Sequence, residues 1–215
     1  MTTRTITGLV AGALLLLAGC SGESEGQAEP APGPSSPANS QAPTSDEQTT
    51  PPSSNSSDTT TDLPHSGAPA VTNPLPKSVV SGDPCKGLTP DQIRAALGKV
   101  VQGEPDRAAA GPSCYWSNPE QSSGFLLGYD TGTGQGLSAQ YKNTRPTVDM
   151  FEAIKPIGGY PAVRYQASTD SRDCTVAVGI ANEYAISVVA SSDKDPCAGA
   201  ARLTEDVISN LKAKA

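Results

Sequence analysis

The residues of this chain best suited to chemistry are its five cysteines, and the first of them follows a pattern that directs lipid attachment. Residues 17–20 read Leu-Ala-Gly-Cys and close an apolar run that begins at Leu9, with Arg4 supplying a positive charge before it. This is the lipobox pattern, in which a bacterial export signal is removed and the next cysteine is acylated. A secretory signal without lipidation is the alternative. We expect residues 1–19 to be a signal peptide and Cys20 to hold the mature protein on the extracytoplasmic face of the cell membrane.

The four remaining cysteines predict a pair of disulfides, because an even number of thiols in an exported chain tends to oxidise. Three connectivities are possible. The shortest closures join Cys85 with Cys114 and Cys174 with Cys197, and these are the pairs we expect. A zinc site is disfavoured, because no two cysteines lie two to four positions apart.

The chain lacks a recognisable catalytic set. Its single histidine, His65, falls in a segment where we expect no packed scaffold, which removes Ser-His-acid and Cys-His arrangements from the folded domain. Paired carboxylates occur, but we expect them to lie in surface turns and in the first turns of helices rather than to form a glycosidase pair. The pairs are Asp193 with Asp195, Asp170 with Asp173, and Glu205 with Asp206. We therefore expect no enzymatic activity, no cofactor and no metal.

One stretch could form a binding surface. Tyr160, Arg164 and Tyr165 follow a pair of glycines and could present an aromatic and cationic edge to a ligand or partner. The alternative interpretation is a glycine turn that enters an ordinary strand. Trp116, directly after Cys114 and Tyr115, is expected to pack in the core beside a disulfide rather than to form a recognition patch.

The segment between the anchor and the domain has the composition of a disordered linker. Residues 20–80 are rich in serine, proline and threonine and contain no aromatic side chain. Residues 21–80 hold seven acidic residues and one basic residue, so much of the chain's net charge of −7 belongs there. No basic cluster suggests nucleic acid as a partner. We expect a self-repelling tether followed by one domain over residues 81–215.

Helix signals open and close that domain. Thr89, Pro90 and Gln92 form a capping box with proline at the first helical position, and Gly98 marks the end of this helix. Asp195 is placed to cap a last helix, whose apolar residues at positions 203, 207, 208 and 211 recur at helical spacing. A weaker third helix is predicted after Thr147, over residues 148–155.

Strands fill the space between these helices. Residues 174–180 and 186–190 alternate apolar and smaller or polar side chains, which predicts an antiparallel hairpin with an odd number of residues in its turn. Further strands are predicted over residues 114–117, 124–129 and 160–166. The expected fold class is α+β, an antiparallel sheet with helices packed on one side and two disulfides.

Taken in order, these motifs resemble the actinobacterial lipoproteins classed as domain of unknown function 3558. The resemblance rests on the lipobox at residues 17–20 and on short motifs that follow it along the whole domain. The motifs are Asp83-Pro84-Cys85, Leu88-Thr89, Cys114-Tyr115-Trp116, Gly159-Tyr160-Pro161-Ala162, Cys174 and Asp195-Pro196-Cys197. The resemblance implies an exported, lipid-anchored protein and implies no activity, because that family has none assigned.

The function expected first is therefore a cell-envelope lipoprotein that acts as a non-enzymatic interaction or accessory module. Its partners would be the membrane, through acylated Cys20, and an envelope protein. The alternative is a carrier or sensor that holds a lipid or a cell-wall precursor in an apolar cavity. A deep apolar cavity would favour the second function, and a solid core the first.

Overall fold

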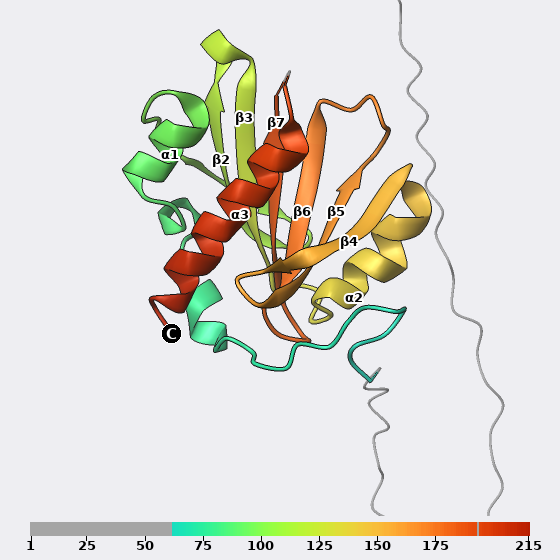
Figure 1. Cartoon of the computed structure of the whole chain (residues 1–215). Coiled ribbons are helices and arrows are strands. Elements are labelled where there is room, and N and C mark those ends of the chain that lie inside the picture. The colour runs from blue at the N-terminus through green and yellow to red at the C-terminus, as the bar shows by residue number, and fades with distance from the viewer. Residues whose placement is uncertain (1–61, 193) are drawn as a thin grey trace, which may run out of the picture. The chain divides into compact units, whose positions relative to one another are not determined.

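A computed structural model describes residues 62–192 and 194–215, which form a seven-stranded antiparallel sheet with helices packed against it (Figure 1). The strand order is β1-β2-β3-β7-β6-β5-β4. Two meanders, β1 to β3 and β4 to β7, are therefore joined where β3 pairs with β7. The predicted α+β class is confirmed. The expected signal peptide, Cys20 and the expected tether up to residue 61 lie outside the described residues.

The strands and helices have short connections. The strands are β1 (Glu104–Ala108), β2 (Gly111–Asn118), β3 (Ser123–Asp130), β4 (Met150–Ile157), β5 (Tyr160–Gln166), β6 (Asp173–Gly179) and β7 (Ala185–Ser191). The helices are α1 (Pro90–Leu97), α2 (Leu137–Ala139) and α3 (Pro196–Lys212). The short α2 continues into a π-helical turn, Gln140–Thr144, and a 3₁₀ turn, Arg145–Thr147.

The caps predicted for α1 and α3 are present. Thr89 accepts a hydrogen bond from the backbone N–H of Gln92, whose side chain accepts from the N–H of Thr89 in return. Gly98 ends α1 in the left-handed conformation, with φ of 75°, which a side chain would disfavour. At α3, Asp195 accepts from the backbone N–H of Ala198. The local sequence signals therefore fix the start of both helices.

The hairpin of β6 and β7 has the predicted register. Val178 pairs with Ile186 and Val176 with Val188, so the apolar side chains of both strands share one face. The turn between Gly179 and Ala185 holds an odd number of residues, as the shared face requires.

The helix predicted over residues 148–155 is wrong, because this segment forms β4. A Gly158-Gly159 turn, with φ of 60° and 94°, folds β4 back on β5. Two central residues with positive φ are what a tight hairpin turn needs. Pro156 is tolerated because β4 is an edge strand with a register shift between Ile154 and Ile157.

The boundary expected at residue 80 must also be corrected. Val71, Leu75, Val79 and Val80 are buried in the main core, so the folded part begins within the segment that composition assigned to the linker. The backbone N–H of Leu75 donates to the carbonyl of Ile180 at 2.9 Å. Isolated apolar residues in a proline-rich background therefore dock on the β6–β7 turn.

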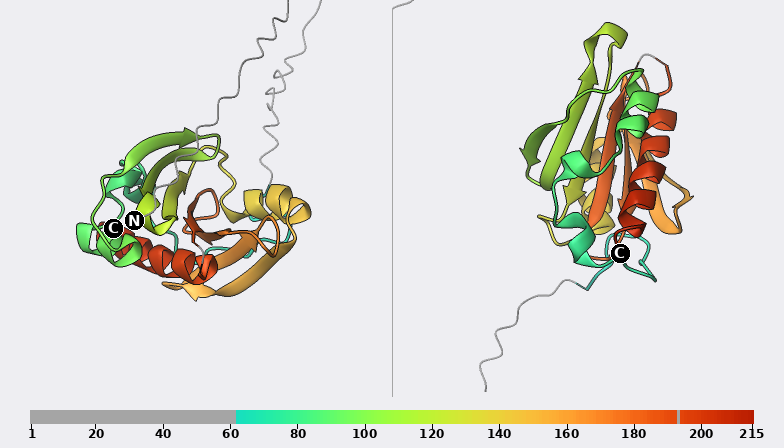
Figure 2. Two further views of the ribbon diagram at one scale, coloured as in Figure 1. Left: turned by 90° about the horizontal axis from the view of Figure 1, so that it is seen from above. Right: turned by 90° about the vertical axis from the view of Figure 1, so that its left-hand side faces the viewer.

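The sheet has two covered faces of unequal extent. The larger core lies under α1 and α3, which Figure 2 shows side by side, and includes Trp116, Phe125 and Val176. On the opposite face, Leu137 of α2 packs with Val163 and Ala177. The two long helices thus occupy one side, as predicted, and the short helical segment after β3 covers part of the other.

Both expected disulfides are formed. Cys85 is joined to Cys114 and Cys174 to Cys197. The first ties the segment before α1 to β2, and the second ties the first turn of α3 to β6. Trp116 is buried, and a side chain at Gly103 would touch both its ring and the Cys114 sulfur. The prediction that Trp116 packs in the core beside a disulfide is confirmed.

Replacing Gly199 of α3 with alanine is expected to raise the free energy of unfolding by about 0.5–1 kcal/mol, because glycine costs about that much in a helix. A Cβ there would meet its nearest atom, the Cβ of Ala190, at an ordinary 3.8 Å. Denaturant titration measures the change. Gly158→Ala is the contrasting control, since its Cβ would lie 2.4 Å from the Ile208 side chain and φ is 60°. Equal destabilisation of both variants would contradict the argument.

Candidate functional site

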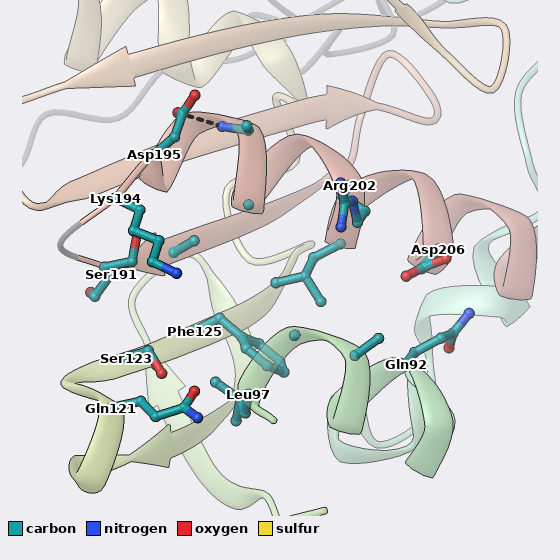
Figure 3. A pocket seen from close by; sticks show the side chains of 18 residues that line it. Gln92, Leu97, Gln121, Ser123, Phe125, Ser191, Lys194, Asp195, Arg202 and Asp206 are labelled. Carbon is teal, nitrogen blue, oxygen red and sulfur yellow. Dashed lines mark hydrogen bonds between the residues drawn. The ribbon is translucent and has the colours of Figure 1, made fainter. Parts of the chain in front are cut away.

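A groove of about 600 Å³ lies between α1 and α3 and is floored by β3 and β7 (Figure 3). We call it the α1–α3 groove. Its α1 wall and its α3 wall come from opposite ends of the folded domain. No short stretch of sequence contains the site.

The groove exists because small residues face one another across it. Ala95 and Ala96 line the α1 side, Ala198 and Gly199 line the α3 side, and Ala190 of β7 lies beneath them. Helices packed through leucine-sized side chains would fill this space. The row of alanine and glycine leaves it open instead.

Polar contacts fix the two ends of α1 in place. The Asn210 side chain of α3 donates to the Gly87 carbonyl and to Gln92 Oε1 of α1, both at 2.9 Å. At the other end of α1, the Asn118 side chain donates to the Leu97 carbonyl at 2.7 Å. These contacts and the disulfide at Cys197 fix both walls, so the groove is preformed rather than a gap that closes by collapse.

The floor of the groove is apolar and rigid. Leu97, Phe125 and Leu203 line it, and each is buried. Phe125 stacks on Trp116 with ring centroids 4.9 Å apart, which contributes on the order of 1 kcal/mol beyond burial. This surface would favour an apolar group of a ligand.

Charged side chains stand on the α3 side of the groove. Lys194 and Arg202 make no ion pair with any residue of the described chain, and neither does Asp206 further along the helix. Figure 3 shows the Lys194 nitrogen directed into the groove and Asp195 turned toward the first turn of α3. The groove therefore has a basic end near Lys194 and an acidic group at Asp206.

Polar groups gather at the basic end. Gln121, Ser123 and Ser191 line it, and the Ser123 hydroxyl is buried without a hydrogen-bond partner among the described residues. Unsatisfied buried hydroxyls are uncommon. This end of the groove therefore has a polar group whose hydrogen bonding the described residues leave unsatisfied.

The basic end lies at the far end of the sheet from the start of the described chain. Val71 bonds to the Asn182 side chain in the β6–β7 turn, whereas Ser191 is at the opposite end of β7. Figure 1 shows the same arrangement, with the start of the coloured chain and the top of α3 at opposite ends of the domain.

The structure does not bring the three predicted binding residues together. Tyr160 is buried in the main core. Arg164 lies on the same face of β5 as Tyr160 and forms an ion pair with Glu152, with 2.7 Å between the nitrogen and the oxygen. Tyr165 points to the opposite face, where its hydroxyl donates to Gln140 at 3.1 Å. None of the three lines the α1–α3 groove.

Tyr165 instead belongs to a half-buried aromatic cluster with Tyr141 and Phe151. Phe151 stacks on Tyr165 at 5.9 Å and meets Tyr141 edge-on at 5.1 Å. Arg145 lies over both Tyr141 and Phe151. The cluster packs the segment after β3 against the sheet, which is a structural role.

A buried carboxyl that sequence reasoning missed is Asp130, at the end of β3. It is 6% exposed, and burial raises its pKa from 3.8 to about 6, although hydrogen bonds from Ser187 and Gln140 oppose the shift. Its second oxygen has no partner among the described residues. Asp130 lies on the face opposite the groove, under the segment that follows β3.

The remaining candidates for chemistry are dispersed. His65 belongs to the folded part, but among the described residues its ring is hydrogen-bonded only to the exposed Ser66 hydroxyl and not to a carboxylate. Asp195 caps α3, Asp173 accepts from Ser191, and Asp193 lies outside the described residues. Over residues 62–192 and 194–215, no group of three or more potential metal ligands is present.

Comparison with known proteins identifies a family but no individual relative. No curated protein and no solved structure matches the chain. The profile of a protein family of unknown function, DUF3558, matches residues 15–210, and the chain therefore belongs to the DUF3558 family.

Proposed function

We propose that this protein is a non-enzymatic, lipid-anchored binding module of the cell envelope that holds a small molecule in the α1–α3 groove. The observation that carries the proposal is the groove itself, with its preformed walls, apolar floor and polar end. Small-molecule sites commonly occupy about 300–1,000 Å³ and combine an apolar lining with a few polar groups. The groove, at about 600 Å³, fits that description.

A small ligand is favoured over a protein surface by the distribution of apolar side chains. In the described part of the chain, only two large apolar side chains are exposed, Val100 and Tyr115. A stable protein interface usually buries about 800 Å² on each partner around aromatic or apolar anchors. The interaction module expected from the sequence has less support here than the carrier or sensor.

Two further observations support a binding role outside the cytoplasm. The paired disulfides suggest an extracytoplasmic protein. The buried carboxyl of Asp130 lies on the opposite face of the sheet and does not line the groove. Among described helices, none is long and apolar enough to cross a membrane.

The lipid anchor is tested by replacing the cysteine of the lipobox. Cys20→Ala is expected to move the protein from the membrane fraction to the soluble extracytoplasmic fraction, because each acyl methylene contributes about 0.8 kcal/mol to membrane binding. Cell fractionation and metabolic labelling with a fatty-acid analogue measure this change. Ser21→Ala is the matched control and should stay labelled and membrane-bound. Unlabelled wild-type protein would contradict the anchor without affecting the groove.

The bound small molecule is tested by mass spectrometry of protein purified from its own host. We expect the native mass to exceed the denatured mass by one non-covalent ligand, which separates the ligand from the covalent acyl chains. Ala95→Leu with Ala198→Leu should fill the groove and abolish this difference. Both alanines are exposed, so neither change alters the core.

Ala213→Leu, at the end of the same helix and away from the groove, is the matched control and should retain the ligand. Circular dichroism verifies that all variants are folded. Equal native and denatured masses in the wild type would overturn the proposal. A ligand retained in the variant with two leucines would also overturn it. The same holds if the groove crosslinks to an envelope protein and no small molecule is bound.

A further inference from the structure

We propose that the ligand of the α1–α3 groove is an elongated anionic amphiphile, with its carboxylate or phosphate at Lys194 and Arg202 and its apolar chain along the floor. This inference rests on the proposed function and specifies the chemical class of the ligand. It follows from the shape of the floor, the unpaired charges and the polar groups at one end.

The floor suits a narrow aliphatic chain. Its width is set by facing alanines and a glycine, while Leu97, Phe125 and Leu203 give it an apolar base along its length. Apolar surface removed from water there would contribute about 25 cal/mol per Å².

The charges favour an anionic head group. Lys194 and Arg202 are both unpaired within the described chain and stand on the same side of the apolar floor. The carboxylate of Asp195 accepts the Ala198 N–H and makes no ion pair with either cation among the described residues. A ligand anion would make the charge-assisted hydrogen bonds that these two cations lack.

Asp206 fixes the direction in which the ligand lies. It occupies the α3 side beside Gln92, beyond Arg202, and would repel an anion at that end (Figure 3). At the other end, near Lys194, the Ser123 hydroxyl has no hydrogen-bond partner among the described residues. Both features place the head group between Lys194 and Arg202, on the side away from Asp206, with the chain over the floor formed by Leu97, Phe125 and Leu203.

The test uses probes with one chain length and different head groups. The full mature chain carrying Cys20→Ala is used, so that its own acyl chains cannot occupy the groove. Calorimetry should detect binding of dodecyl phosphate and dodecanoate, and dodecyltrimethylammonium should bind at least about tenfold more weakly. Inorganic phosphate alone should bind negligibly, which separates an amphiphile site from a simple anion site.

Variants assign the head group to its residues. Lys194→Gln with Arg202→Gln should weaken dodecyl phosphate binding about tenfold or more and leave binding of the cationic probe no weaker. Arg107→Gln with Lys155→Gln removes two exposed charges outside the groove and should change neither. Equal binding of anionic and cationic probes would overturn the inference, as would unchanged binding of dodecyl phosphate by the Lys194 and Arg202 variant.

The inference and the proposed function fail in distinguishable ways. If host-purified protein carries a non-covalent ligand that is lost on filling the groove, but the anionic probes do not bind, the proposed function stands and the amphiphile is wrong. If no ligand co-purifies and no probe binds, both are overturned.

Discussion

Replacing both Cys174 and Cys197 with alanine is expected to lower the free energy of unfolding by roughly 3.5 kcal/mol, the loop-closure entropy of a bridge that spans 23 residues. The loss is large beside the roughly 5–15 kcal/mol of a typical domain. Alanine is the appropriate replacement because Cys174 is buried and faces Ala190 across the strand pair. A serine hydroxyl at that position would add its own desolvation cost.

The structure predicts more than a change in global stability. Cys197 lies in the first turn of α3, and the bridge is the covalent link between that turn and β6. Without it, the α3 wall of the groove depends on the Asp195 cap and on the packing of Leu203 and Val207. We therefore expect faster hydrogen exchange in the first turns of α3, while the end near Leu211 changes less.

Denaturant titration under oxidising and reducing conditions measures this effect. The wild type should lose more stability on reduction than the variant, because the variant has one bridge left to break. Cys85→Ala with Cys114→Ala is the matched comparison, and its span of 29 residues predicts a similar loss of stability. A loss below about 1 kcal/mol for the Cys174 and Cys197 variant would mean that the unfolded chain is already constrained.

Local signals predicted the parts of the fold that neighbouring residues determine. The Thr89, Pro90 and Gln92 pattern located α1, and the alternating residues 174–180 and 186–190 gave both the hairpin and the parity of its turn. The cysteine pairs also followed from separation, because each pair closes a short loop. In these cases the physical cause lies within a few residues or along one chain segment.

Sequence reasoning failed where a distant contact decides the structure. Met150, Phe151 and Ile154 fit a helical spacing, but Phe151 pairs with Tyr165 across the β4–β5 hairpin. Similarly, Val71 and Leu75 are too sparse to suggest a core, and they become buried only because the β6–β7 turn receives them.

The α1–α3 groove could not be predicted, because its signal consists of alanines and a glycine in two distant helices. Ala95 and Ala198 are ordinary helix formers when each helix is considered alone. The space that their small side chains leave open exists only because Asn210 and Asn118 fix the position of α1. Asp130 was missed for the same reason, since the segment after β3 covers it.

Asp130→Asn is expected to remove a pH dependence of stability that the buried carboxyl imposes. Its pKa is about 6 in the folded protein against an ordinary 3.8, so the folded state binds this proton more tightly than the unfolded state does. The free energy of unfolding therefore falls as the pH rises from about 4 to about 6. A difference of about 2 pKa units corresponds to on the order of 3 kcal/mol.

The variant should consequently be more stable than the wild type at pH 7 and should lose that advantage near pH 4. Asparagine can still accept the hydrogen bond that the Ser187 hydroxyl donates to Asp130 at 3.1 Å. Its amide nitrogen takes the place of an oxygen that lacks a partner among the described residues, so the gain at pH 7 should be below the full linkage value.

Denaturant titration of both proteins between pH 4 and pH 8 measures the difference, and other titrating groups cancel in the comparison. Asp170→Asn, at an exposed carboxyl, is the matched control and should run parallel to the wild type. If the free energy of unfolding of the Asp130 variant had the same pH dependence as that of the wild type, the carboxyl would have to reach water in the folded state. The segment from Leu137 to Thr144 would then have to open over this face of the sheet, which hydrogen exchange at Gln140 would detect.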